Sequence, residues 1–393
     1  MTGRWGVLAV LCLARVSMGL HLQAVAAVAP FLMTDLGLGY GEVGTLIGVF
    51  VLPGAVLAVP AGLVSRRFGD TRTLLGTIVL LAIGTAGLAV SNGFWPALLA
   101  RLIAGAGATL LTMQVAKTAT DWFAGRELSR AMGFMLGTYP LGIAAVMVVL
   151  PLIARATSWR LAVALVAGSA IVVFAIVAVC LRDPSRPPTV AGGARPKLGG
   201  ISRREAALVL IAGASFSLIN ASYVIFTSFV PVALVRQGRS EIEAGVLVSW
   251  ASWVLIVTPP LVGYLLDRWG GLTAWLLGSA VVGVLACLAL PSLEPAWLWI
   301  VLFGMVMGPT AVGAVALPGE VLRPETRGPG FGLFFATNYV AFGVLPAAAG
   351  FLLDLTGSAS IALLFDAVIL LAFMALVIWF RFVQRPIISG RFS

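Results

Sequence analysis

Apolar stretches of roughly twenty residues alternate with short polar segments along almost the whole chain. Each stretch is long enough to cross the hydrocarbon core of a bilayer as one helix. Backbone groups inside lipid must form hydrogen bonds within their own segment, so we expect each stretch to be helical. The pattern predicts twelve membrane spans, at residues 5–32, 43–64, 73–93, 95–116, 129–153, 160–181, 206–232, 244–266, 272–291, 296–317, 329–353 and 359–380.

The amino-acid composition excludes a soluble protein. Of 393 residues, 60% are hydrophobic and 10% are charged, whereas an ordinary soluble domain is about 25% charged. The sequence therefore predicts an all-α membrane protein.

The net charge of +10 could indicate a nucleic-acid partner. However, most Lys and Arg residues fall in segments that share one side of the membrane if the N-terminus is cytoplasmic. This asymmetry is the positive-inside pattern. It predicts that both termini are cytoplasmic, that the protein lies in the plasma (inner) membrane with lipid as its partner, and that it binds no nucleic acid.

Two sequence patterns recur at one offset and predict a duplicated unit. Residues 42–46, which open the second span, recur in similar form as residues 243–247. The set Gly62, Arg67 and Gly69 recurs at 263, 268 and 270, and both offsets are 201 residues. Two motifs with the same spacing indicate an internal repeat of six spans.

One long polar stretch, rich in Pro, Gly and basic residues, separates the two repeats. Such a composition is typical of a flexible linker. We expect an N-terminal bundle at 1–181, a cytoplasmic linker at 182–204, a C-terminal bundle at 205–381 and a cytoplasmic tail at 382–393.

Three segments resemble motifs of the major facilitator superfamily. Residues 263–270 resemble its G-x-x-x-D-R-x-G loop, residues 62–69 resemble the same loop with Arg66 in place of Asp, and residues 101–107 are similar to its R-x-x-x-G-x-G motif. Within the superfamily, Arg15, the turn at 66–69 and the segment 139–142 look closest to the cyanate- and nitroimidazole-permease type and related anion carriers.

The resemblance implies the major facilitator fold, with two pseudo-symmetric six-helix bundles around a cavity lined by spans 1, 4, 7 and 10. One bundle would rock against the other to give alternating access. Such a protein is a secondary transporter, is not an enzyme, uses no cofactor and usually works as a monomer. Glycines four residues apart, such as Gly304 and Gly308, would let its helices pack closely.

The same loops imply a gate on the cytoplasmic side. In the family, the acid and arginine equivalent to Asp267 and Arg268 form a latch that closes this side. The equivalent N-terminal loop has Arg66 and Arg67, so it lacks the acid of the latch. Asp70, four residues on, is the candidate substitute.

Two arginines inside predicted spans are the leading candidates for contact with a solute. Each charge at the centre of a membrane helix costs about 2.5–3.5 kcal/mol, and spans 1, 4, 7 and 10 contain no acid that could pair with Arg15 or Arg101. A guanidinium suits carboxylates and oxyanions, so we expect a small anionic solute. The alternative is that one arginine binds backbone carbonyl groups.

Polar residues of the first span add two candidates. His21, the only histidine, could carry a coupled proton, or it could be a hydrogen-bonded packing residue. Gln23 lies about 80° from Arg15 around the helix and is predicted to share its cavity side.

A polar and aromatic face on the seventh span is predicted to line the cavity. Phe216, Asn220, Tyr223 and Thr227 recur at helical spacing on one face. The residues expected to complete this lining are Tyr139, Trp250, Trp253, Asn338 and Tyr339. Hydrogen bonding between helices is the alternative for each polar member.

Several other groups are given structural interpretations. Lys117 and Asp121 have the i, i+4 spacing of a structural ion pair. Asp366, in the last span, is expected in a packing or interface role. The three cysteines lie in different spans without metal-ligand spacing, so no metal site is predicted, and the sequence contains no P-loop or catalytic cluster.

The leading hypothesis is transport of a small anion by proton symport or anion exchange, with the solute and a proton or counter-anion as partners. The alternative is a proton-coupled exporter of drugs or metabolites. The absence of an acid in spans 1 and 4, and Tyr139-Pro140 in place of the Gly-Pro pattern typical of such exporters, weigh against export. A receptor that has kept the fold without transport is a third hypothesis, but no sensor domain is evident.

Overall fold

The computed structural model describes residues 3–57, 69–123, 127–181 and 201–389. Every regular element in this described part is a helix. In the N-terminal half these are α1 (Arg4–Ala27), α2 (Ala29–Leu36), α3 (Tyr40–Gly48), α4 (Gly54–Leu57), α6 (Asp70–Ala89), α7 (Phe94–Phe123), α8 (Leu128–Ala156) and α9 (Trp159–Cys180). In the C-terminal half these are α10 (Arg203–Arg236), α11 (Glu241–Trp269), α12 (Leu272–Ala289), α13 (Ala296–Val321), η2 (Pro324–Thr326), α14 (Arg327–Thr356) and α15 (Ser360–Ser389).

Eleven helices in the described part are long and apolar enough to cross a membrane. The predicted second span, 43–64, corresponds to α3 and α4 with a turn between them, and its last residues lie outside the described part. The first predicted span, 5–32, is broken at Val28, where α1 ends and α2 begins with Pro30 in its first turn. A proline is tolerated there because the first helical N–H groups need no partner within the helix.

The predicted boundaries between halves fall partly on undescribed residues. Residues 182–200 of the predicted linker lie outside the described part, and α10 already begins at Arg203. Its N-terminus has a capping box, in which the Ser202 hydroxyl and the Glu205 carboxylate each accept a backbone N–H of the other residue. Most of the predicted tail belongs to α15, which continues to Ser389.

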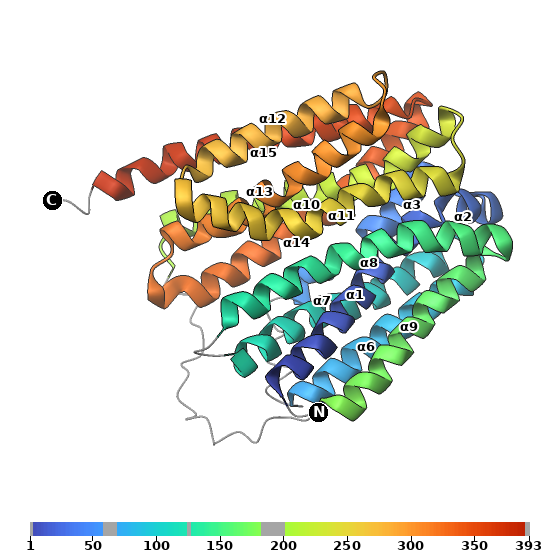
Figure 1. Ribbon diagram of the computed structural model, residues 1–393, viewed down its shortest axis with the longest axis horizontal. Coiled ribbons are helices and arrows are strands. Elements are labelled where there is room, and N and C mark those ends of the chain that lie inside the picture. Colours follow the sequence, from blue (N-terminus) through green and yellow to red (C-terminus); the bar gives the residue numbers. More distant parts are fainter. Residues whose placement is uncertain (1–2, 58–68, 124–126, 182–200, 390–393) are drawn as a thin grey trace.

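The two halves meet at one end of the molecule. We call the end that holds α2 and α3 the far end, and the end that holds both chain termini the termini end (Figure 1). Contacts between the halves join α3 to α14, α8 to α11, and α1 to α10. In Figure 1 the two bundles converge toward the far end.

Glycines allow the backbones of the two halves to touch. A Cβ atom at Gly44 would lie 2.2 Å from the carbonyl oxygen of Pro346, and one at Gly48 would lie 2.0 Å from that of Gly343. No side chain fits at these distances, so α3 and α14 can pack this closely only because both positions are glycine. Within the C-terminal half, Gly304 and Gly308 of α13 also pack closely on α11, against the backbone of Ala251 and the side chain of Thr258.

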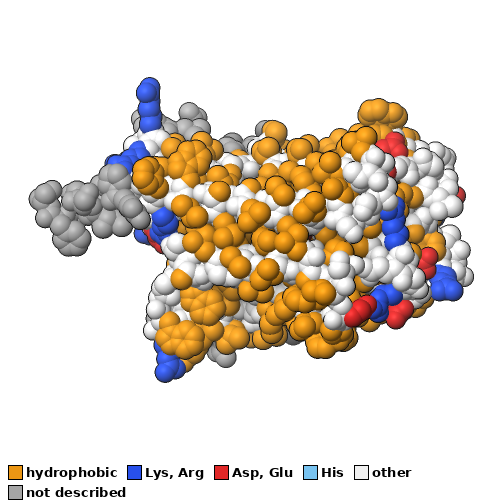
Figure 2. Space-filling view, turned by 90° about the horizontal axis from the view of Figure 1, so that it is seen from above, with side chains coloured by type: hydrophobic (Ala, Val, Ile, Leu, Met, Phe, Trp, Pro, Cys, Tyr) orange, Lys and Arg blue, Asp and Glu red, His pale blue; other side chains and the backbone are white. Residues whose placement is uncertain are grey.

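The outer surface suits a bilayer. Figure 2 shows one face on which hydrophobic side chains cover the middle, while charged side chains gather toward its ends. Exposed leucine, valine and tryptophan side chains are common along the long helices, as expected for surfaces that contact lipid.

We predict that Gly142→Ala will destabilise the protein, because α1 and α8 touch at this position. A Cβ atom there would lie 2.1 Å from the carbonyl oxygen of Val16. Overpacking of this kind should lower the free energy of unfolding by about 2–3 kcal/mol, measured as a fall in thermal midpoint in detergent. Gly168→Ala is the control, because no atom lies within 4 Å of a Cβ there. Equal midpoints for the two variants would contradict the close contact.

Candidate functional site

Arg101 is buried and binds the backbone of two other helices. From α7, its Nε donates to the carbonyl of Leu46 at 2.9 Å, and its Nη1 and Nη2 donate to those of His21 and Leu22 at 2.8 and 3.0 Å. The guanidinium also lies 4.2 Å from the ring centroid of Phe50, and the residue is 0% exposed. All three guanidinium nitrogens therefore donate hydrogen bonds to backbone carbonyl groups. This is the alternative considered from the sequence, in which one of the two arginines binds backbone carbonyls.

Arg15 has a different environment. It lies in the middle of α1 and is half-buried, with its guanidinium carbon 6.0 Å from the ring centroid of Tyr139. Its Nε is buried and has no hydrogen-bond partner. Within the part of the chain that the structure describes, no carboxylate pairs with it. Arg15 is therefore the intramembrane cation that remains available to a ligand.

Two tyrosines, one from each half, lie near Arg15, and a third lies near one of them. Tyr139 of α8 and Tyr339 of α14 lie within electrostatic range of its guanidinium, and Tyr223 of α10 lies within range of Tyr139. The hydroxyl of Tyr223 is 2.6 Å from Oγ of Ser252. We call Arg15, Tyr139, Tyr223 and Tyr339 the arginine–tyrosine cluster. It places one cation among neutral phenol groups that can donate hydrogen bonds.

Other predicted lining residues bind one another. Asn220 donates to Oδ1 of Asn338 at 3.0 Å and to the carbonyl of Phe216. This pair joins α10 to α14, which is the helix–helix alternative considered from the sequence. Trp253 is 47% exposed on α11, and among the described residues no polar or ring contact links it to the cluster. Contact of Asn220, Asn338 and Trp253 with a solute stays a prediction.

Gln23 and His21 are fully buried on α1. Nε2 of Gln23 donates across the two halves to Oγ1 of Thr227 and Oγ of Ser228, both at 3.0 Å. Nδ1 of His21 lies 2.7 Å from the carbonyl of Ser17, and its Nε2 has no partner. Gln23 and Thr227 thus connect the halves, while the proton-coupling role of His21 stays a prediction.

Comparisons with known proteins agree with this architecture. The sequence profile described as Major Facilitator Superfamily matches residues 11–303 and 221–391. The chain belongs to this superfamily. It is a membrane transporter and not an enzyme, as the sequence predicted.

The names of individual relatives of this chain indicate different substrates. The lysosomal dipeptide transporter MFSD1 of Danio rerio is 22% identical over 386 residues, which cover 91% of this chain and 82% of MFSD1. The hexuronate transporter of Bacillus subtilis (strain 168) is 28% identical over 160 residues, 41% of this chain and only 38% of that protein. The crystal structure of a bacterial homolog of the human lysosomal transporter Spinster, inward-facing and occupied, has a TM-score of 0.78 at 16% identity and covers 98% of this chain and 97% of that one.

The family's cytoplasmic gate is only partly within the described residues. Arg66, Arg67 and the side chain of Asp267 lie outside them. Arg268 is exposed and reaches the hydroxyl of Tyr264 at 3.4 Å. Asp70 is buried at the start of α6, where Gln114 and Lys117 of α7 both donate to its carboxylate. These partners lie in its own half, and a latch function for Asp70 stays a prediction.

The structure agrees with the structural roles that the sequence predicted for the Lys117–Asp121 pair and for Asp366. Lys117 and Asp121 form the expected i, i+4 ion pair at 3.5 Å. Asp366 is fully buried and accepts from the thiol of Cys287 at 3.7 Å, so it packs α15 against α12 inside the C-terminal half.

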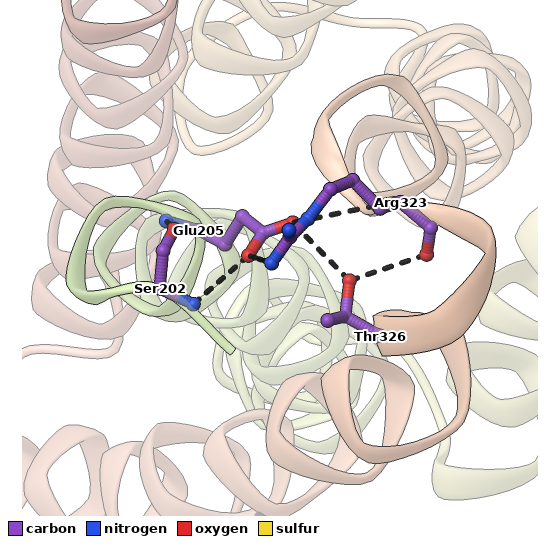
Figure 3. Close-up of polar contacts among 4 residues, drawn as sticks. All are labelled: Ser202, Glu205, Arg323 and Thr326. Atoms are coloured by element: carbon purple, nitrogen blue, oxygen red, sulfur yellow. Dashed lines mark hydrogen bonds and ion pairs between the residues drawn. The ribbon is translucent and has the colours of Figure 1, made fainter. Parts of the chain in front are cut away.

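An ion pair at the start of α10 was not predicted. Glu205 accepts from Nε and Nη2 of Arg323, both at 3.0 Å, and from Oγ1 of Thr326 (Figure 3). The carboxylate raises the pKa of Arg323 by binding its charged form. The S-x-x-E spacing of Ser202 and Glu205 could have indicated the helix cap, but nothing in the sequence paired Glu205 with a residue more than one hundred positions away.

We predict that Arg101→Gln will strongly destabilise this transporter. Charge-assisted hydrogen bonds contribute about 1.5–3 kcal/mol each, so losing those to α1 and α3 should lower the free energy of unfolding by about 3 kcal/mol or more. Arg15→Gln is the matched control. It removes an unpaired charge, so the thermal midpoint should stay the same or rise. A larger loss for Arg15→Gln than for Arg101→Gln would contradict these assignments.

Proposed function

We propose that this protein is a secondary active transporter that moves a small anionic solute across the membrane by alternating access, with Arg15 as the residue that binds the anion. The single observation that carries this proposal is the buried and unpartnered Nε of Arg15, in the middle of a membrane helix. The coupling that we propose is proton symport or anion exchange.

The energetics of Arg15 support an anionic ligand. A cation at this depth costs about 2.5–3.5 kcal/mol, and no carboxylate among the described residues offsets it. A bound anion would neutralise the guanidinium and satisfy its free N–H group. A guanidinium also offers parallel N–H donors that match a carboxylate or an oxyanion.

The phenol groups support a site shared between the halves. Tyr139 belongs to the N-terminal half, whereas Tyr223 and Tyr339 belong to the C-terminal half. A solute held by Arg15 and these hydroxyl groups would contact both bundles. Its binding can therefore change the relative free energies of the inward-open and outward-open states, which alternating access requires.

Other parts of the proposal rest on sequence and relatives. The hexuronate named for one relative is a carboxylate, which agrees with an anionic solute. We propose that His21 carries the proton if coupling is by symport, that the protein works as a monomer in the plasma membrane, and that both termini are cytoplasmic.

We predict that anions will stabilise the wild-type protein against heat and that Arg15→Gln will abolish this effect. The purified protein would be heated with small carboxylates, cyanate, nitrate, neutral solutes or organic cations. Ligands raise the thermal midpoint only when they bind the folded state. Arg15→Lys should keep part of the response because it retains the charge. Stabilisation by organic cations, equal in wild type and Arg15→Gln, would favour the exporter hypothesis instead.

We predict that Tyr139→Phe will weaken anion binding about tenfold, because a hydrogen bond to a charged group contributes about 1.5 kcal/mol or more. The ring beside Arg15 is retained, so the thermal midpoint without ligand should change little. Binding would be measured by titrating the stabilising anion. Tyr264→Phe is the control, since Tyr264 is exposed on α11. Equal weakening in both variants would remove Tyr139 from the site.

A further inference from the structure

One buried acid has no role in the function proposed above. Asp366 lies on α15, with about 9 Å of helix between it and Ser360 at the start of that helix. It is 0% exposed, its Oδ1 has no hydrogen-bond partner, and its Oδ2 accepts from the thiol of Cys287 on α12 at 3.7 Å. Among the described residues, no cation pairs with this carboxyl group. An ionised carboxylate is costly inside a membrane helix, and a bound proton removes that cost.

The groups that face Asp366 come from three neighbouring helices. Helices α10, α12 and α14 pack against α15. Ser222 of α10 and Cys287 of α12 lie beside the carboxyl group. From α14, the apolar Ala349 and Leu353 join a buried cluster with residues of α15. In the described part of these helices, Cys287 is therefore the one titratable group next to Asp366.

Both polar neighbours suit a carboxyl group that gains and loses a proton. A serine hydroxyl can donate to a carboxylate or accept from a carboxylic acid, and a thiol is a weak donor to either form. Oγ of Ser222 has no other hydrogen-bond partner among the described residues, so it can serve both forms. A metal ion fits less well, because a thiol donor already occupies one carboxyl oxygen. The described residues also contain no group of three His, Cys, Asp or Glu side chains that could hold a metal.

A pocket reaches this pair of side chains from the far end. Its volume is about 350 Å³, and residues of α12, of α15 and of the connections beside them line it. Its polar lining residues other than Cys287 are all exposed, and they are Ser292, Thr356, Ser358 and Ser360. Cys287 also lines it but is only 1% exposed. Because α12 ends and α15 begins at the far end (Figure 1), solvent from that side comes within one side chain of Asp366.

Helix α10 connects Asp366 with the arginine–tyrosine cluster. Ser222, beside Asp366, directly precedes Tyr223 of the cluster. A negative charge at Asp366 would repel an anion held at Arg15, because charges interact strongly across a medium of low dielectric constant. A proton on Asp366 removes this repulsion. By linkage, a bound anion must then favour the binding of the proton by the same factor.

We propose that Asp366 is a proton-binding site which exchanges protons with the far side of the membrane through this pocket, and that its protonation strengthens the binding of the anion at Arg15. The site lies inside the C-terminal half, away from Arg15 and His21 in the N-terminal half. The first part of the proposal stands without any solute. The second part rests on the proposed function for the anion and for its position at Arg15.

Infrared spectroscopy of proteoliposomes tests the first part. A protonated carboxyl group has a C=O stretching band that a carboxylate lacks. Vesicles of each orientation would be held on an attenuated total reflection cell while the external pH is raised from about 5 to about 9, and protease access to a C-terminal tag identifies the side that holds the termini. The band should be lost when the pH rises on the far side and should persist when it rises on the termini side. Asp366→Asn should lack the band.

Controls assign the band to Asp366. Asp35→Asn removes a far-end acid that is bound to Trp159 and Arg160, and it should leave the band in place. A band that is missing from the wild type, that remains in Asp366→Asn, or that responds to the termini side overturns the proton site. If Asp366→Asn does not fold, Ser222→Ala should shift the band by removing a neighbour of the carboxyl group. Ser215→Ala, which removes a buried serine of α10 that donates to the carbonyl of Ile211, should not shift it.

The second part is tested by the pH dependence of anion binding. Nitrate is a suitable probe because its charge does not change over the pH range used. From thermal midpoints titrated with nitrate, the wild type should bind about tenfold more tightly at about pH 6 than at about pH 8. Asp366→Asn should bind tightly at both values, since its side chain is always neutral. The same pH dependence in the wild type and in Asp366→Asn would reject the linkage.

The two experiments fail separately. If neither nitrate nor any other anion stabilises the protein at any pH, the anionic function falls together with the linkage, and the infrared band alone decides the proton site. If anions stabilise the wild type through Arg15 but the band is absent, the proposed function stands and the proton site is rejected.

Discussion

The hydrogen bonds of Arg101 hold the N-terminal half together at the depth where transport must occur. Its guanidinium draws α7 against the carbonyl groups of α1 and α3. In a bilayer these interior carbonyls would otherwise bind only within their own helices, and the arginine would be an unpaired charge. The contact points on α1, His21 and Leu22, directly precede Gln23. The same interaction that buries Arg101 therefore fixes where Gln23 meets the other half, and it fixes the helix on which Arg15 is placed.

Strong contacts within the halves contrast with weak contacts between them. Within a half, a guanidinium binds three carbonyls, and the carboxylate of Glu205 binds Arg323 through two nitrogens. Between the halves, the described hydrogen bonds are those of the Gln23 amide with two hydroxyl groups and those of the exposed Asp354 carboxylate with the N-terminus of α3. Glycines such as Gly44 and Gly48 let the backbones of α3 and α14 touch. Such a distribution suits two rigid bodies that move against each other.

Hydrophobic stretches were sufficient to predict the fold, because the bilayer requires helices of a certain length wherever the chain is apolar. They could not predict the break at Val28 or the division between α3 and α4, where no strongly polar residue interrupts the pattern. The site was harder to predict for a clear physical reason. Arg15 and Arg101 have equal insertion costs in sequence, and only tertiary structure shows that one finds backbone partners while Nε of the other finds none. The sequence likewise could not show that Asn220 and Asn338, both predicted lining residues, bind each other.

The two repeats differ in charge at the start of their first helices. Arg4 and Glu127 form an ion pair at 2.8 Å between the start of α1 and the segment before α8. Glu205, 201 residues after Arg4, is an acid that pairs with Arg323, so the first helices of the two repeats begin with opposite charges in their ion pairs.

The same offset relates Arg15 to Phe216 and Gln23 to Val224, so the C-terminal repeat has neither the central cation nor a glutamine that binds across the halves. A symmetric protein would place two guanidinium groups at the centre, where they would repel each other across a medium of low dielectric constant. With Arg15 alone, the arginine–tyrosine cluster has one cation in the N-terminal half and phenol groups from both halves. An anion bound there would be attracted mainly to one bundle and would bridge to the other through hydroxyl groups. The loss of symmetry at these positions is therefore what would allow a single solute to bring the two halves together.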